Sequence, residues 1–245
     1  MQRVDADEIL DSDGCSARDV QGALAVLGRI NRWFGGVATT RKMVERVGQV
    51  TGEKHFSMLE VAAGLGQVPE EVCAEVGRRG IKLDVTLLDR APSHLPTKNQ
   101  NKTGVITHQI VADALALPFP DRAFDLVSCS LFAHHLNAQP LAQFMREGLR
   151  VSRRALLIND LIRHPLHLAL TYASYPIMRN RVAWLDGLTS VRRAYVPEEI
   201  RSVLASALCC EMQVEISRNY LFRMGVIVWK DQGAPREATA RPTLP

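Results

Sequence analysis

Acidic residues stand at the ends of short apolar runs in this chain, where they could contact a polar ligand. Glu60 lies at the end of the apolar run 56–61, and the small residues Ala62, Gly64 and Gly66 follow it. A strand, a small-residue turn and a helix in this order let the backbone approach a nucleotide-like ligand closely. A carboxylate ahead of the glycines would repel the phosphates of a dinucleotide but suits a ligand with a cationic centre and no phosphate.

Further polar side chains follow apolar runs in the same way. Asp89 follows one run, Asp113 follows the next, and a polar segment at 128–135 follows a third. Because ligands of open α/β sheets bind beyond the carboxyl ends of the strands, we expect these side chains to face one pocket. S-adenosylmethionine carries a sulfonium and no phosphate, so it suits this set of groups.

Apolar runs alternate with helical patterns from residue 53 onward, which is typical of parallel βαβ units. The last two runs are separated only by a polar turn at 217–219, so they can pair only as an antiparallel hairpin. We therefore expect an α/β fold with a doubly wound, mostly parallel seven-stranded sheet that ends in an antiparallel hairpin. The expected strands cover 56–61, 85–88, 105–111, 124–130, 155–159, 212–216 and 222–229, with helices over 69–79, 140–151 and 197–207.

Three regions are expected along the chain. Residues 1–52 carry helical patterns over 17–33 and 39–47 and would form an N-terminal helical cap. Residues 53–230 would form the S-adenosylmethionine-binding domain. Residues 231–245 are rich in Pro, Ala and Thr and would be a disordered tail.

The order of these motifs over about residues 56–230 resembles the class I methyltransferases, whose first motif is an acidic residue followed by small residues. The resemblance implies that Glu60 lies near the methionine part of S-adenosylmethionine. It implies that Asp89 accepts hydrogen bonds from both ribose hydroxyls, which suits a carboxylate, and that Asp113 lies near the adenine. Ala62 stands where the family has a glycine. The implied cofactor-binding residues are Glu60, Ala62, Gly64, Gly66, Asp89, Arg90, Asp113, Ala114 and Ser130.

His134 and His135 follow the fourth strand, where the acceptor pocket of such enzymes begins, and they are the candidate catalytic residues. Imidazole titrates near neutral pH and can take a proton from an acceptor hydroxyl. The structural alternative is one packed and one exposed histidine, just as an N-cap role is the alternative for Asp160. The apolar stretch 166–178 is expected to form a buried or substrate-facing helix. The candidate substrate contacts are Asn31, Arg32, Asp160, Arg163 and Tyr172.

Two shorter motifs narrow the resemblance. Residues 27–36 read Leu-x-x-Ile-Asn-Arg-x-x-Gly-Gly, and residues 157–161 read Leu-Ile-Asn-Asp-Leu. Both are similar to a bacterial subgroup of methyltransferases that are often encoded beside type III polyketide synthases and act on phenolic lipids. The resemblance implies a small, apolar phenolic or quinol acceptor, with O-methylation favoured. The alternatives are a C-methyltransferase of quinone biosynthesis and a non-catalytic cofactor-binding partner protein.

Composition argues against several other classes of protein. The basic residues are spread along the chain and no motif for holding a flipped base follows the fourth strand, so no nucleic-acid partner is expected. Pro69 stands where a nicotinamide-binding motif needs its third glycine. The five cysteines are scattered and no recognised metal spacing occurs, so we expect a reducing cytoplasm and no metal. We also expect no secretory signal and no transmembrane segment.

Overall fold

The computed structural model describes residues 1–11, 17–96, 106–208 and 212–230 of the 245-residue chain. This part contains one seven-stranded sheet of order β3-β2-β1-β4-β5-β7-β6. Neighbouring strands are parallel except that β7 runs antiparallel to both β5 and β6. The expected doubly wound sheet with a terminal hairpin is therefore confirmed. The strands are β1 (His55–Val61), β2 (Lys82–Asp89), β3 (Ile106–Val111), β4 (Phe124–Ser130), β5 (Ser152–Leu161), β6 (Val214–Asn219) and β7 (Arg223–Trp229).

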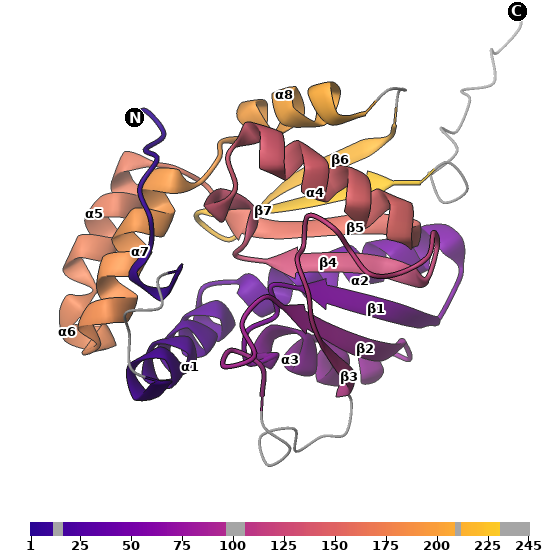
Figure 1. Cartoon of the computed structure of the whole chain (residues 1–245), viewed down its shortest axis with the longest axis horizontal. Helices are drawn as coiled ribbons and strands as arrows, with labels where there is room; N and C mark the ends of the chain where they lie inside the picture. The colour runs from indigo at the N-terminus through magenta and orange to yellow at the C-terminus, as the bar shows by residue number, and fades with distance from the viewer. Residues whose placement is uncertain (12–16, 97–105, 209–211, 231–245) are drawn as a thin grey trace, which may run out of the picture.

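Helices cover both faces of the sheet and one of its ends (Figure 1). Helices α2 and α3 pack on one face, and α4 and α8 pack on the other. Helix α7 packs against α1, α5 and α6 beyond the carboxyl ends of the parallel strands. The α-helices are α1 (Ala17–Trp33), α2 (Gly36–Thr51), α3 (Gln67–Gly77), α4 (Ala138–Val151), α5 (Pro165–Ala173), α6 (Tyr175–Met178), α7 (Arg181–Arg193) and α8 (Pro197–Ala207), with short 3-10 turns η1 (Ile9–Asp11) and η2 (Ala133–His135).

The central strands are buried on both faces because their side chains alternate between two cores. On β1, Phe56 and Met58 join the core beneath α2 and α3, whereas Leu59 and Val61 join the core beneath α4 and α8. A strand with two buried faces reads as a continuous apolar run. This explains why apolar runs alone located the parallel strands to within a few residues.

Buried amide and guanidinium groups fasten the turn between α1 and α2 to the sheet. The side-chain amide of Asn159 on β5 donates to the carbonyl of Gly36 at 2.7 Å and to the hydroxyl of Thr40 at 2.8 Å. The guanidinium of Arg223 on β7 donates to the Asn31 side-chain oxygen at 2.6 Å. The motifs at 27–36 and 157–161 thus meet in space.

We expect Asn159→Ala to lower the free energy of unfolding by about 2 kcal/mol, because it leaves a buried carbonyl without its donor. Urea titration followed by circular dichroism measures this change. Gln143→Ala is the matched control, since the exposed Gln143 amide also donates to a carbonyl, and its effect should stay within about 0.5 kcal/mol. Equal effects of the two substitutions would show that the Asn159 contact does not stabilise the fold.

Two sequence-based expectations about elements are wrong. The polar residues 217–219, expected as a turn, belong to β6, and residues 220–222 make the turn instead. The stretch 166–178 forms α5 and α6 rather than one buried helix, and α5 has no buried residue. Leu166 is 55% exposed and Ile177 is 76% exposed. Helix α5 is short and packs mainly on α7, so its apolar side chains keep a free face.

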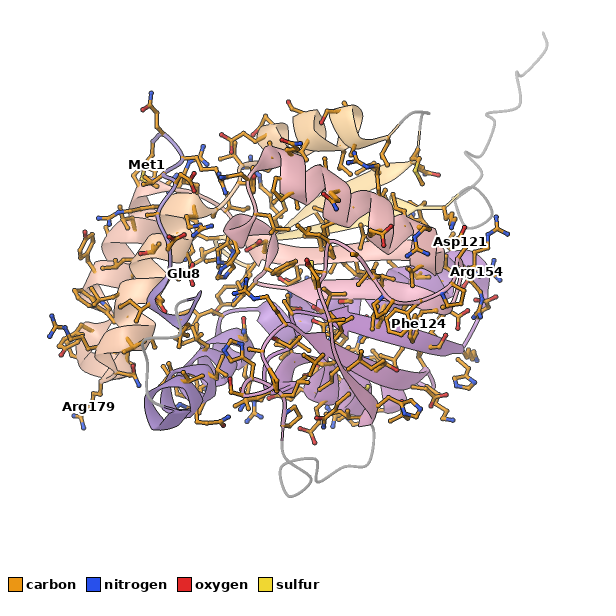
Figure 2. The ribbon with its side chains drawn as sticks, viewed as in Figure 1. Met1, Glu8, Asp121, Phe124, Arg154 and Arg179 are labelled. Carbon is orange, nitrogen blue, oxygen red and sulfur yellow. The ribbon has the colours of Figure 1, made fainter. Side chains whose placement is uncertain are left out.

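The N-terminal segment, residues 1–11, lies along α7. The backbone N–H groups of Ile9 and Leu10 donate to the carboxylate of Asp186 at 2.7 and 3.0 Å. Figure 2 shows Met1 at the edge of the molecule and Glu8 turned into its interior. Of the two helices of the expected N-terminal cap, α2 packs on the sheet and α1 covers the end of the sheet. The expected domain boundary between residues 52 and 53 stays a prediction. The expected disordered tail, 231–245, lies outside the described residues.

Among the helices that the structure describes, none combines the length and apolar character needed to cross a bilayer. The expected cytoplasmic location stays a prediction.

Candidate functional site

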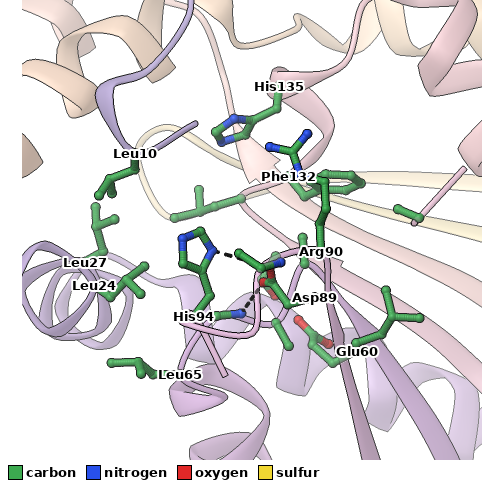
Figure 3. A pocket seen from close by; sticks show the side chains of 18 of the residues that line it. Leu10, Leu24, Leu27, Glu60, Leu65, Asp89, Arg90, His94, Phe132 and His135 are labelled. Atoms are coloured by element: carbon green, nitrogen blue, oxygen red, sulfur yellow. Dashed lines mark hydrogen bonds and ion pairs between the residues drawn. The ribbon is translucent and has the colours of Figure 1, made fainter. Parts of the chain in front are cut away.

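A cavity of about 670 Å³ opens beyond the carboxyl ends of β1, β2 and β4, under α1 and the N-terminal segment (Figure 3). Acidic groups come from the strand ends, while leucines come from α1 and the segment before it. Of the residues expected at the site, the cavity is lined by Asn31, Glu60, Ala62, Gly64, Asp89, Arg90, Asp113, Ala114, Ser130 and His135. The topology has therefore gathered polar groups from four strand ends into one cavity.

Glu60 brings a buried carboxylate to the floor of this cavity. Its side chain is 1% exposed, and its Oε2 atom has no hydrogen-bond partner among the described residues. Burial raises the pKa of Glu60 to about 7, because the charged form loses hydration. An unpartnered carboxylate oxygen at this position suits a ligand that brings a cationic or hydrogen-bond-donating group, such as the ammonium of the methionine part of S-adenosylmethionine.

The turn after β1 is built from left-handed backbone conformations. Ala62, Gly64 and Gly66 have φ values of 54°, 52° and 69°. A Cβ atom on Gly66 would lie 2.6 Å from a methyl carbon of Leu87, so glycine is needed there for packing as well as for backbone conformation. Gly66 is the N-cap residue of α3 and does not line the cavity. Ala62 adopts the strained conformation that a glycine would occupy without cost.

Asp89 forms hydrogen bonds with the turn after β1 and with the turn after β2. Its Oδ2 accepts from the backbone N–H of Gly64 at 3.0 Å and its Oδ1 from that of Ala91 at 3.1 Å. His94 places a ring nitrogen 3.4 Å from the same Oδ1. Although burial opposes it, hydrogen bonds from His94, Ala91 and Gly64 lower the pKa of Asp89, so the carboxylate is charged at neutral pH. Each oxygen keeps acceptor capacity for a ribose hydroxyl.

Asp113 follows β3 and lines the cavity with Ala114. The Asp113 Oδ1 accepts from the backbone N–H of Leu115 at 2.9 Å, which fixes the turn. Its second carboxylate oxygen can accept from a ligand amino group. The placement of Asp113 near the adenine, which the resemblance to class I methyltransferases implies, stays a prediction.

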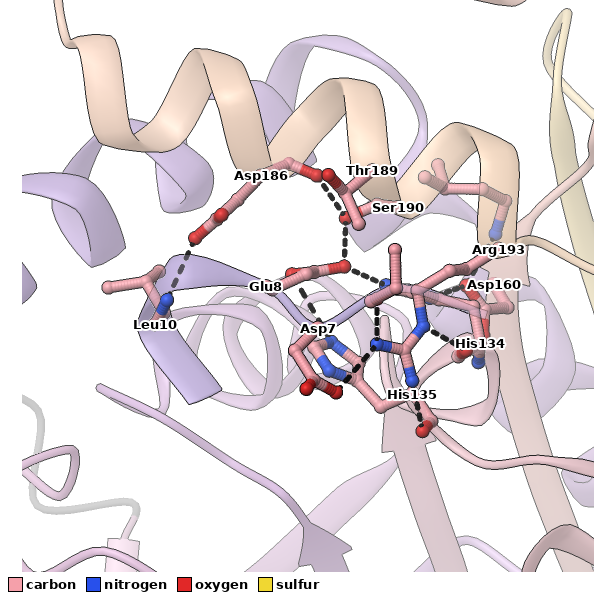
Figure 4. Close-up of polar contacts among 12 residues, drawn as sticks. Asp7, Glu8, Leu10, His134, His135, Asp160, Asp186, Thr189, Ser190 and Arg193 are labelled. Atoms are coloured by element: carbon pink, nitrogen blue, oxygen red, sulfur yellow. Dashed lines mark hydrogen bonds and ion pairs between the residues drawn. The ribbon is translucent and has the colours of Figure 1, made fainter. Parts of the chain in front are cut away.

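His134 lies behind the cavity wall and is held by two carboxylates (Figure 4). Its Nδ1 lies 2.7 Å from Asp160 Oδ1, and its Nε2 lies 3.4 Å from Glu8 Oε1. Burial alone would lower the pKa of His134, but the neighbouring carboxylates of Asp160 and Glu8 raise it to about 10. Without another cation, the imidazole therefore carries a proton between the two carboxylates.

His135 faces the cavity, with its ring centroid 4.4 Å from that of His134 and stacked at 6.4 Å on Phe132. Its Nε2 lies 3.6 Å from Glu8 Oε2. Arg193 holds this corner, because its guanidinium donates to the carbonyls of His134 at 3.1 Å, of His135 at 2.5 Å, and of Ala6.

Several residues expected to contact substrate lie outside the cavity lining. Arg32 is exposed and pairs with Glu71. Arg163 is buried and pairs with Glu199 at 2.6 Å, while Tyr172 is exposed on α5 and contacts Arg192 and Trp184 of α7. Asp160 is buried behind His134 and does not cap a helix; the cap of α5 is His164. Of the five candidate substrate contacts, only Asn31 reaches the cavity.

Sequence reasoning missed a group of lining residues that come from distant parts of the chain. Glu8 lies in an acidic segment with no helical pattern, and Arg193 lies at the end of a helix. Leu24 and Leu27 were expected on a helix face, but the face turns toward the cavity rather than into a core. The missed lining residues include Asp7, Glu8, Leu10, Leu24, Leu27, His94, Phe132 and Arg193.

Residues 59–155 match the family model described as a methyltransferase domain. They run from β1 into β5 and carry most of the polar cavity lining. This part of the chain is similar to a methyltransferase domain. The match agrees with the expected enzyme class and with S-adenosylmethionine as the expected cofactor. The residues present suit that cofactor, because Glu60 offers an unpartnered oxygen and Asp89 offers spare acceptor capacity in the same cavity.

The chain is also similar in sequence to a known methyltransferase and in fold to solved methyltransferase structures. A demethylmenaquinone methyltransferase of Renibacterium salmoninarum is 33% identical over 135 residues, or 55% of this chain and 49% of that protein. The aligned part thus spans about half the length of that relative. The plantazolicin methyltransferase BpumL, in complex with a triazolic desmethylPZN analog and SAH, has a TM-score of 0.64 at 13% identity over 87% of this chain and 90% of its own.

A second solved structure extends the comparison of folds. An O-methyltransferase family 2 protein from Planctomyces limnophilus, in complex with apigenin, has a TM-score of 0.59 at 17% identity over 89% of this chain and 63% of its own. At these identities the likeness is one of fold, and it confirms the expected Rossmann-like architecture of the methyltransferase domain.

The raised pKa of Glu60 gives a pH-dependent prediction for the methyltransferase domain. A ligand with an ammonium group prefers the ionised carboxylate, so S-adenosylhomocysteine affinity should rise with pH up to about 7, about tenfold per pH unit below that value. The thiols of Cys73 and Cys129 lie near Glu60 but do not titrate in this pH range, because burial raises their pKa values. Calorimetry between pH 5.5 and 8 measures the affinity.

Glu60→Gln should flatten this pH profile, whereas Glu198→Gln, on the exposed start of α8, should preserve it. The free energy of unfolding depends on pH in the opposite direction to the ligand affinity. The folded-state pKa of about 7 exceeds the unfolded value near 4.5, so the folded chain holds the extra proton, and unfolding becomes easier as pH rises between these values. An unchanged pH profile in Glu60→Gln would exclude Glu60 as the titrating group.

Proposed function

We propose that this protein is an S-adenosylmethionine-dependent methyltransferase that acts on a small, apolar phenolic or quinol acceptor. The observation that carries the proposal is the single cavity that joins the Glu60 and Asp89 carboxylates to the histidine corner. In Figure 3, Glu60 and His135 lie at opposite ends of this cavity. One end suits the cofactor and the other suits the acceptor.

The chemistry needs little more than alignment. When bound, S-adenosylmethionine supplies a methyl group on a cationic sulfur, and transfer to an acceptor oxygen releases the proton of its hydroxyl. Asp89 and Glu60 would orient the donor, and alignment of this kind can supply about 7–11 kcal/mol of barrier reduction. His135 and Glu8 are the titratable groups at the acceptor end, and we assign them the acceptance of the hydroxyl proton.

The cavity walls support an apolar acceptor. Leu10, Leu24 and Leu27 form one wall, and Phe132 and Leu136 form another. Such a surface would bind an aromatic ring face and leave its hydroxyl beside His135. The resemblance to enzymes encoded beside polyketide synthases and the apigenin bound by one structural neighbour, a phenolic compound, both support O-methylation.

C-methylation of a quinone precursor is the second candidate. The demethylmenaquinone methyltransferase relative favours it, although that alignment covers only about half of either protein. Methylation of a ring carbon needs an activated ring, which deprotonation of a quinol hydroxyl by His135 or Glu8 would supply. The same residues can therefore serve both reactions, and the product decides between them.

The first experiment is calorimetric titration of the purified chain with S-adenosylhomocysteine, with NADH as the control ligand. Labelled S-adenosylmethionine is then incubated with a panel of alkylphenols, alkylresorcinols and quinols, and the methylated atom is found by NMR. Binding followed by an O-methylated product supports the main proposal, and a ring-methylated product supports the second candidate. Binding without turnover on the panel would favour the non-catalytic partner protein, and absence of binding would overturn all three.

A further inference from the structure

Three side chains that can bind metal ions converge at the acceptor end of the cavity. Glu8 comes from the N-terminal segment, and His134 and His135 come from η2; one ligand atom from each lies within 4.8 Å of the others. We propose that Glu8, His134 and His135 bind a divalent transition-metal ion of the zinc type. The described part of the chain offers no second group of this kind.

The separations suit a shared central ion better than direct ion pairs. Glu8 Oε1 lies 3.4 Å from His134 Nε2 and Glu8 Oε2 lies 3.6 Å from His135 Nε2, whereas the direct contact of His134 with Asp160 is 2.7 Å. Two ligand atoms of a tetrahedral zinc, with bonds of about 2.1 Å, are expected about 3.4 Å apart. Both Glu8 separations lie close to this value and are long for charge-assisted hydrogen bonds.

The nitrogen of His134 that would bind the metal ion is Nε2, and no other role is evident for it among the described residues. Its side chain is 2% exposed, and Nε2 has no hydrogen-bond partner among the described residues. The hydrogen bond of Nδ1 with Asp160 leaves Nε2 pointing toward Glu8. Without a metal ion, a proton on Nε2 is the only positive charge between this nitrogen and the Glu8 carboxylate, and a bound metal ion would replace that proton.

Each of these two ligands is oriented by a further contact, as ligands of metal sites usually are. Asp160 accepts from the His134 backbone N–H at 2.9 Å as well as pairing with its ring. The Ser190 hydroxyl donates to Glu8 Oε1 at 2.7 Å. Carboxylate–histidine–metal arrangements of this type fix the ring orientation and make the nitrogen a stronger ligand.

The charge around the cluster also favours a cation. Glu8 and Asp160 supply two buried carboxylates. The charged neighbour on α7, Arg193, directs its guanidinium to the carbonyls of His134, His135 and Ala6, so it supports the loop rather than neutralising Glu8. Two imidazoles and one carboxylate form the His₂Glu donor set that zinc accepts, whereas Mg²⁺ and Ca²⁺ prefer oxygen ligands alone.

Three protein ligands leave one tetrahedral position open, and Glu8 and His135 both line the cavity. An acceptor hydroxyl could occupy that position, where the ion would lower its pKa so that its proton passes to solvent water. With the ion bound, His135 and Glu8 would act as its ligands in place of accepting the proton themselves. This catalytic role rests on the proposed methyl transfer, but the binding of the ion does not. The expectation of no metal arose because Glu8 is far from the two histidines in sequence.

The test is titration of the EDTA-treated full-length protein with Zn²⁺ by calorimetry, and with Co²⁺ by visible absorption, which reports four-coordinate geometry. We expect one Zn²⁺ per chain, Co²⁺ bands of a four-coordinate site, and no binding of Mg²⁺. Glu8→Gln and His135→Ala should each weaken Zn²⁺ binding at least about 100-fold, and Asp160→Asn about tenfold. His108→Ala, an exposed histidine on β3, should not change it.

Absence of stoichiometric Zn²⁺ binding by the wild-type protein would overturn the proposal, as would unchanged affinity in Glu8→Gln. Circular dichroism of each variant separates loss of a ligand from loss of the fold. S-adenosylhomocysteine affinity is measured on the same metal-free protein. Failure of Zn²⁺ binding with that affinity intact sinks the metal site alone, and the converse result sinks the proposed function alone.

Discussion

Asp89→Ala is expected to weaken S-adenosylhomocysteine binding about 100-fold. A hydrogen bond to a charged group contributes about 1.5–3 kcal/mol, so loss of the two expected from the ribose hydroxyls costs at least about 3 kcal/mol, which corresponds to about 100-fold or slightly more. The substitution also removes the acceptor for the Gly64 N–H, which positions the turn after β1. Calorimetric titration measures the change, and Asp89→Asn should fall between the two affinities because it keeps one acceptor.

Asp84→Ala is the matched control for this measurement. Asp84 lies on the same strand, is partly exposed, and pairs with His55 at the opposite end from the cavity. Its substitution should leave the affinity unchanged. Wild-type affinity in Asp89→Ala would remove Asp89 from the cofactor site, whatever the enzyme's acceptor proves to be.

His135→Ala is expected to lower kcat on the true acceptor at least about 100-fold while S-adenosylhomocysteine affinity stays within about twofold. General acid–base catalysis contributes about 10²–10⁴ in rate. The imidazole is needed in either case, as the proton acceptor when no ion is bound or as a ligand of the proposed cation. Single-turnover rates with saturating cofactor measure the chemical step without product release. A wild-type rate in this variant would return His135 to a purely structural role.

His134→Ala is a poorer probe of the same chemistry. It would leave Asp160 buried without its imidazolium partner, and breaking a buried ion pair costs about 3–5 kcal/mol. A loss of activity in His134→Ala would therefore report unfolding as readily as catalysis. His135 is the more informative position, because its side chain is partly exposed to the cavity.

The cofactor end of the site could be predicted because strand order alone brings its residues together. Glu60 and Asp89 stand at the ends of neighbouring parallel strands, and such ends meet at one edge of the sheet. Local sequence is enough to find the strands, since both faces are buried and the runs are continuously apolar. Ser130, at the end of β4, reaches the same cavity for this reason.

The acceptor end could not be predicted, because packing between distant segments builds it. Glu8 and His134 are separated by most of the methyltransferase domain, and nothing in the spacing of either residue indicates the other. The apolar composition of one segment also led to a wrong prediction. The apolar stretch 166–178 indicated burial, yet α5 lies at the periphery and packs mainly on α7, with Leu166 and Leu170 exposed.

The contacts of the N-terminal segment have a consequence for synthesis on the ribosome. Ile9 binds Asp186, 177 positions later, and Arg3 binds the carbonyl of Arg193, 190 positions later. The strands that carry Glu60 and Asp89 can pair while translation continues, but the segment that carries Glu8 must wait until α7 has been made. One wall of the cavity therefore consists of residues that are made before the strands but reach their final position only after α7 has been made.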